Sequence, residues 1–129
     1  MLKLLLIGAC ALISINSQGQ DLKNYPNKPV KIVVPLGAGG GTDIAARLLA
    51  AALTETLGQS FYIENKTGAA GNIGMTYVAQ SAADGYTLLM GNVSTNAINE
   101  TIFAKQLKII PSEDLVPISM VASIPNLVV

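Results

Sequence analysis

The most informative stretch of this chain is Lys31-Ile32-Val33-Val34-Pro35-Leu36-Gly37-Ala38-Gly39-Gly40-Gly41-Thr42-Asp43. An apolar run typical of a strand ends at Pro35, and four glycines follow before a helical pattern begins. Thr42 is the expected helix N-cap, and Asp43 favours the first helical turn. A glycine-rich turn between a strand and a helix exposes several backbone N–H groups beside the positive end of the helix dipole. The stretch therefore predicts a site for an anion, either a phosphate or a carboxylate.

The flanking sequence predicts alternating strands and helices. We expect strands over residues 30–34, 61–64 and 86–90, and helices over 42–57, 73–83 and 97–103. Gly58 is the expected stop of the first helix. The stripe predicted to face the core of that helix consists of Ile44, Leu48, Leu49, Ala52, Leu53 and Leu57. Residues 111–114 are expected to form a loop before an apolar run over 115–122. The β-α-β-α-β order indicates an α/β fold with a mostly parallel sheet and flanking helices.

Three loops of small residues follow the predicted strands, after residues 34, 64 and 90. The carboxyl ends of parallel strands lie at one edge of a sheet, and ligands of such sheets bind there. We therefore expect the three loops to converge on one binding site.

The first residues have the three-part plan of a secretory signal peptide, so residues 1–19 are expected to be removed and the protein to be periplasmic. Lys3 gives a basic start, residues 4–15 are almost entirely apolar, and a small polar exit precedes Gln20. Cys10 loosely resembles a lipoprotein cysteine, but too few apolar residues precede it, and we expect it to leave with the leader. The apolar run over residues 126–129 stops without a polar tail, which indicates a truncated sequence or one missing its continuation.

Composition narrows the classes of function. Removal of the leader takes away Lys3 and no acid, which leaves 7 basic against 8 acidic residues and a formal charge of −1. A near-neutral chain gives no electrostatic support for nucleic-acid binding. The sequence contains no histidine, so His-dependent catalysis and the commonest metal ligand are excluded. We expect no catalytic residue, no metal and no cofactor.

Other interpretations of the glycine loop remain open. Gly37-Ala38-Gly39 begins a dinucleotide fingerprint and Glu64 stands where a ribose-binding acid would lie, but the third glycine is replaced by Thr42. A P-loop needs a lysine after the glycines, and none follows. A purely structural turn is a further alternative. Asp43 and Arg47, four residues apart on the predicted helix, are expected to form a surface ion pair.

The ordered set of loop motifs strongly resembles the Bug receptors, the extracytoplasmic solute-binding proteins of tripartite tricarboxylate transporters. The matching motifs are Tyr25-Pro26-x-Lys28-Pro29-Val30, Gly39-Gly40-Gly41-Thr42-Asp43, Glu64-Asn65, Gly68-Ala69-x-Gly71-Asn72-Ile73-Gly74, Asp84-Gly85-Tyr86-Thr87-Leu88-Leu89 and Ala97-Ile98-Asn99. The resemblance implies a periplasmic binding protein-like (type II) lobe that closes with a second lobe around a small organic anion. Residues 20–129 would be part of the first lobe and would reach the hinge near residues 120–129, with the second lobe missing.

The resemblance also implies the binding residues. They are Gly39, Gly40, Gly41, Thr42 and Asp43 in the first loop, Gly68, Ala69, Gly71 and Asn72 in the second, and Ser94, Thr95, Asn96 and Asn99 in the third. Ala70 stands where the family commonly has glycine. The implied partners are a small organic carboxylate (a di- or tricarboxylate, an amino acid or an aromatic acid) and the membrane subunits of a transporter. A secreted or misassigned dinucleotide-binding oxidoreductase and a truncated remnant that binds nothing are the alternative hypotheses.

Overall fold

The computed structural model describes residues 24–124. The predicted leader over residues 1–19, Cys10 and the final apolar run lie outside the described residues, as does part of the predicted hinge. Among the described residues, no helix is long and apolar enough to cross a membrane.

Three parallel strands form the sheet, in the order β2-β1-β3. They are β1 (Val30–Val34), β2 (Phe61–Asn65) and β3 (Thr87–Leu89), each within a residue or two of its predicted position. Ile32 of the central strand lies opposite Ile63 on one side and Leu88 on the other. A central parallel strand is covered on both faces, which is why β1 is apolar at every position except Lys31 rather than alternating.

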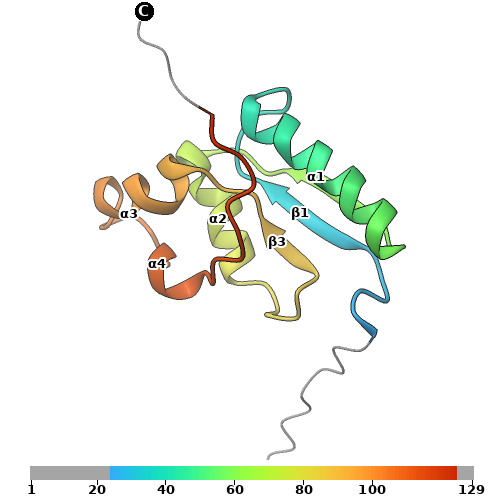
Figure 1. The fold of residues 1–129 in the computed structure, drawn as a ribbon. Helices are drawn as coiled ribbons and strands as arrows, with labels where there is room; N and C mark the ends of the chain where they lie inside the picture. Colours follow the sequence, from blue (N-terminus) through green and yellow to red (C-terminus); the bar gives the residue numbers. More distant parts are fainter. Residues whose placement is uncertain (1–23, 125–129) are drawn as a thin grey trace, which may run out of the picture.

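Helices cover the two faces of the sheet (Figure 1). Ala50 of α1 (Gly41–Leu57) packs in the core with Val30, Ile32 and Phe61. On the opposite face, Tyr77 of α2 (Asn72–Ala79) accepts a hydrogen bond from Lys31 Nζ at 3.0 Å. The order β2-β1-β3 with one helix on each face follows from two right-handed crossovers, and it confirms the predicted parallel α/β fold.

The predicted inward stripe of α1 is correct only in part: Leu53 packs against the core, but the register of the other predicted positions is wrong. The buried residues of this helix are Asp43, Ala46 and Ala50. By contrast, the side chains of Ile44 and Leu48 are 53% and 69% exposed. Small alanine side chains let the helix approach the sheet closely, and the polar contacts of Asp43 fix its rotation. The predicted stop at Gly58 is confirmed: this residue has φ 69° and donates its N–H to Thr54 O.

The chain after β3 is more helical than predicted. A π-helical turn, η3 (Ser94–Ile98), starts inside the expected third loop and runs into α3 (Asn99–Ile102). The expected loop at residues 111–114 is a short helix, α4 (Pro111–Asp114), in which Asp114 accepts the Ile110 N–H at 2.7 Å. Residues 115–124 carry no regular secondary structure and pass in front of the sheet (Figure 1).

Candidate functional site

The three loops meet at the carboxyl ends of the strands, as predicted. Gly71 of the second loop lies between the first and the third. A Cβ atom on Gly71 would stand 2.6 Å from Thr95 Cγ2 and 3.4 Å from Pro35 Cβ. The side chain of Asn65, at the end of β2, also donates to Leu36 O in the first loop at 3.2 Å. Segments far apart in sequence therefore form one packed edge.

The buried side chain of Asp43 holds the first loop through hydrogen bonds. Asp43 and Arg47 form the predicted ion pair, but its predicted surface location is wrong for Asp43. The carboxylate is only 2% exposed, although the Arg47 side chain is 53% exposed. The carboxylate accepts hydrogen bonds from Gly39 N, Arg47 Nε and Asn65 Nδ2, each at 2.9 Å, and from Arg47 Nη2 at 3.1 Å. The Arg47 guanidinium, followed by the Gly39 N–H and the Asn65 amide, holds the pKa of Asp43 well below its usual range.

The N-cap of α1 is Gly40, and the prediction of Thr42 as the cap is wrong. No side chain caps this helix end, because the carboxylate of Asp43, the third helical residue, reaches back to the Gly39 N–H instead. Within residues 24–124, the N–H groups of Gly41, Thr42 and Asp43 have no hydrogen-bond partner. These three donors stand at the positive end of a helix of 17 residues.

The second loop has an unusual backbone. Gly68, Ala69, Ala70 and Gly71 follow one another with φ values of 124°, 47°, 57° and 94°. The Gly71 N–H closes this turn on Gly68 O at 2.9 Å, and within the described chain the N–H groups of Ala69 and Ala70 have no partner. A left-handed conformation costs an alanine about 1–2 kcal/mol, so neighbouring groups must hold the turn in place.

The third loop supports the second loop through buried side chains. Thr95 is fully buried, and its hydroxyl accepts the Asn92 N–H at 3.0 Å and donates within the same turn. Ser94 and Asn96 are exposed, so they are the members of this loop that a ligand can reach. Asn99 is 4% exposed and donates to Ala70 O and to Asn72 Oδ1.

Glu64 does not have the environment of a ribose-binding acid. One of its carboxylate oxygens pairs with Lys31 Nζ at 2.6 Å, and the other pairs with Lys66 Nζ at 3.2 Å. Lys31 first and Lys66 second lower the pKa of Glu64. Because both oxygens are engaged in ion pairs, Glu64 is not available to bind a ribose, which argues against the dinucleotide alternative. Residues 24–124 also contain no group of three His, Cys, Asp or Glu side chains placed to hold a metal ion.

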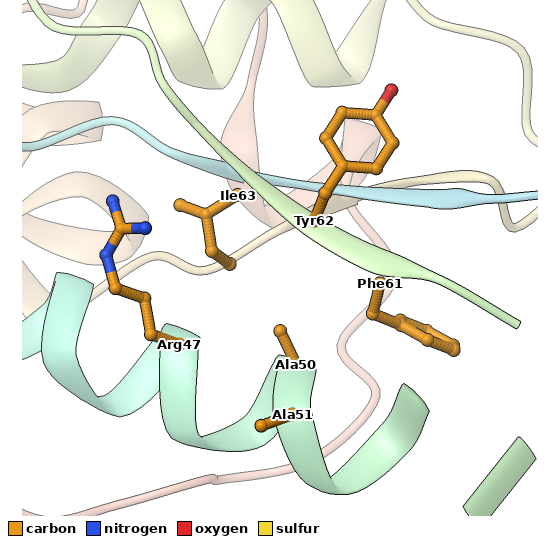
Figure 2. A pocket seen from close by; sticks show the side chains of 6 residues that line it. All are labelled: Arg47, Ala50, Ala51, Phe61, Tyr62 and Ile63. Atoms are coloured by element: carbon orange, nitrogen blue, oxygen red, sulfur yellow. The ribbon is translucent and has the colours of Figure 1, made fainter. Parts of the chain in front are cut away.

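The structure also contains a hollow of about 460 Å³ between α1 and β2, which the sequence does not predict. Figure 2 shows it with Arg47 at one end and Phe61 at the other. The lining residues are Arg47, Ala50, Ala51, Phe61, Tyr62 and Ile63. The hollow lies beside the first residues of β2, whereas the second loop follows its carboxyl end. No residue pattern predicts it, because it depends on how closely α1 packs on the edge strand.

Comparisons with known proteins find related sequences and related structures. The sequence model of the tripartite tricarboxylate transporter family receptor matches residues 45–129. BugT of Bordetella pertussis (strain Tohama I) is 43% identical over 111 residues, which cover 81% of this chain and 32% of BugT. MatC from Rhodopseudomonas palustris, solved with bound malate, superposes with a TM-score of 0.71 at 39% identity, over 75% of this chain and 33% of MatC. The R. palustris protein Rpa4515, solved with adipate, gives a TM-score of 0.53 at 50% identity, over 54% of this chain and 23% of Rpa4515.

The chain spans about a third of the length of BugT. Its parallel α/β architecture is that of periplasmic solute-binding proteins, and the described residues form part of one domain. This chain belongs to the tripartite tricarboxylate transporter receptor family, which includes the Bug receptors.

Proposed function

We propose that this protein is an extracytoplasmic receptor that captures a small organic carboxylate and delivers it to the membrane subunits of a tripartite tricarboxylate transporter. The main support for the proposal is a set of N–H groups, at the start of α1 and in the second loop, that have no hydrogen-bond partner among the described residues. These groups belong to two loops whose bases are packed together through Gly71 and Pro35.

Backbone donors are suited to a carboxylate. Two loops approaching from different directions can each supply N–H groups to one carboxylate, and the dipole of α1 adds a favourable field. The negative charge of Asp43 does not oppose such a ligand strongly, because the Arg47 guanidinium binds its carboxylate through two nitrogens. The site therefore needs no net positive charge, in keeping with a near-neutral chain.

The proposed roles divide the predicted site residues into two groups. The ligand contacts Gly41, Thr42, Ala69, the side-chain amide of Asn72 and the exposed side chains of Ser94 and Asn96. The second group supports the loops and contacts the ligand little or not at all: Gly39, Gly40, Asp43, Gly68, Gly71, Thr95 and Asn99. No residue of either group is a candidate nucleophile activated by a base, so we propose a binding protein and not an enzyme.

The family relatives suggest the class of ligand. MatC was solved with malate and Rpa4515 with adipate, and both ligands are small dicarboxylates. We propose a dicarboxylate as the first class to test here. We also propose that the protein is periplasmic and that the apolar leader over residues 1–19 directs its export.

Isothermal titration calorimetry tests the proposal on the protein expressed from its complete reading frame. Malate, adipate and NAD are titrated separately. The receptor proposal predicts saturable heat with at least one dicarboxylate and none with NAD. Binding of NAD without binding of a dicarboxylate supports the oxidoreductase hypothesis, and the absence of any binding supports the remnant hypothesis; either result contradicts the proposal.

A variant links the binding to the first loop. Gly40 has φ −73°, and a Cβ there would stand 3.4 Å from Gly37 O, so a side chain is compatible with the fold. Gly40→Val is expected to weaken dicarboxylate binding by crowding the approach to the helix start. Thr56→Val, near the opposite end of α1, is the matched control and should bind as the wild type does.

A further inference from the structure

We infer that Asn99 is a positioning residue, which holds the second loop in its left-handed turn and orients the Asn72 amide for the carboxylate. The inference rests on the proposed function. Asn99 is the first residue of α3 and is separated from Ala70 by 29 positions in sequence. It connects the helix after the third strand with the loop after the second.

The contacts of Asn99 fix the orientation of its side chain. Its Nδ2 donates to Ala70 O at 2.9 Å and to Asn72 Oδ1 at 2.7 Å. A backbone carbonyl can only accept a hydrogen bond, so the Nδ2 end of the Asn99 amide must face the loop. With 4% of Asn99 exposed, water has little access to replace either contact.

The hydrogen bond to Ala70 O acts on the strained part of the loop. Ala70 has φ 57° and ψ 28°, a conformation that alanine rarely adopts. Rotation of Ala70 to a negative φ would redirect its peptide groups and break the contact with Asn99. The Ala70 N–H, one of the unpartnered donors of the proposed site, keeps its direction only while this conformation persists.

The second contact orients Asn72. Because Asn72 Oδ1 accepts from Asn99, the Nδ2 group is the free end of the Asn72 amide, and among the described residues it has no hydrogen-bond partner. Asn72 directly follows the turn and begins α2. Asn99 thereby leaves both a backbone N–H and a side-chain N–H₂ of the second loop available to an anion.

A double-mutant cycle with Ala70 tests this role by calorimetry with malate and adipate. Asn99→Ala is expected to weaken dicarboxylate binding about tenfold, since the hydrogen bonds that hold the turn are lost. Glycine adopts the left-handed conformation without strain, so the loss of the Asn99 side chain should weaken binding less in an Ala70→Gly background. The double variant Asn99→Ala/Ala70→Gly should recover a substantial part of the lost affinity. Asn99→Asp keeps the shape of the side chain but places a carboxylate oxygen against Ala70 O and Asn72 Oδ1, so this variant should also bind weakly.

Glu100→Ala is the control on the same helix. Glu100 accepts hydrogen bonds from Ser112 N and Ser112 Oγ and has no hydrogen bond to the second loop, so its loss should lower the melting temperature without changing affinity. If Asn99→Ala likewise lowers the melting temperature and leaves the dissociation constant unchanged, Asn99 is only structural and the inference is wrong. Equal binding by Asn99→Asp and the wild type also overturns it, and serves as the test if Asn99→Ala does not fold. A wild-type protein that binds neither dicarboxylate refutes the proposed function itself, and the inference with it.

Discussion

Gly71→Ala tests most sharply whether the three loops form one packed junction. Gly71 is buried and has φ 94°, and its missing side chain leaves room for Thr95 and Pro35 from the other two loops. An alanine methyl group at this position would stand 2.6 Å from Thr95 Cγ2, well inside van der Waals contact. The fully buried Thr95 is held by hydrogen bonds to Asn92 and cannot turn away freely.

Two effects contribute to the expected loss of stability. A Cβ in the left-handed region costs about 1–2 kcal/mol, and forcing an extra methyl group into a packed site typically costs about 1–3 kcal/mol. We therefore expect Gly71→Ala to lower the free energy of unfolding by about 3 kcal/mol. Gly58→Ala provides the matched control, because Gly58 has φ 69° but nothing within 4 Å of its Cβ position. It should lose only about 1–2 kcal/mol, from the backbone conformation alone.

Urea unfolding, followed by far-UV circular dichroism, measures the free energy of unfolding of all these variants. Gly37→Ala completes the series, since Gly37 has no positive φ and nothing within 4 Å of its Cβ position, and its stability should stay within about 0.5 kcal/mol of the wild type. A loss for Gly71→Ala no greater than that for Gly58→Ala would refute the packed junction of the three loops.

Three further variants test separate parts of the structure. Asp43→Asn should reduce the dependence of stability on acid pH. The folded pKa of Asp43 is depressed, so its stabilisation is complete above the unfolded pKa of about 3.9 and is lost as the pH falls toward the folded value. Melting temperatures measured between neutral and acid pH check this. If the melting temperature of the variant depends on pH as steeply as that of the wild type, the buried network of Asp43 is contradicted. Met75→Ala, at a fully buried position of α2, should lower the free energy of unfolding by about 2–5 kcal/mol in urea. Ala70→Gly should raise it by about 1 kcal/mol, and a lower stability would argue against a left-handed Ala70.

Local signals predicted much of the fold. The nearly continuous apolar run of β1 and the glycines after it predict a buried parallel strand followed by a helix, and both are present. Gly58 ends α1 as expected because only a left-handed residue closes that helix on Thr54. The convergence of the loops also follows from topology alone, since every parallel strand ends at the same edge.

The remaining features depend on tertiary contacts. Nearly every position of α1 between Ile44 and Leu53 is apolar, so the sequence contains several possible inward stripes. The stripe that the structure uses is selected by the buried contacts of Asp43 with Asn65, a residue 22 positions away. Residues 115–124 are apolar enough for a strand, but strand formation requires a neighbouring strand, and no described strand pairs with them.

The convergence of the loops could be predicted from the sequence, whereas the burial of their polar side chains could not. Thr95 and Asp43 belong to the predicted loops, yet both are buried and use their oxygens within the chain. A sequence cannot distinguish a polar side chain that contacts a ligand from one that holds the loop, because both have the same composition and spacing.

Backbone amide chemical shifts measured during titration with malate test whether the ligand binds to the backbone donors of the first two loops. We expect the largest changes at Gly41, Thr42, Ala69 and Ala70, whose N–H groups have no hydrogen-bond partner within residues 24–124. Saturable binding that leaves these amides unchanged and instead shifts Ala51, Phe61 and Ile63 around the hollow between α1 and β2 would contradict this expectation.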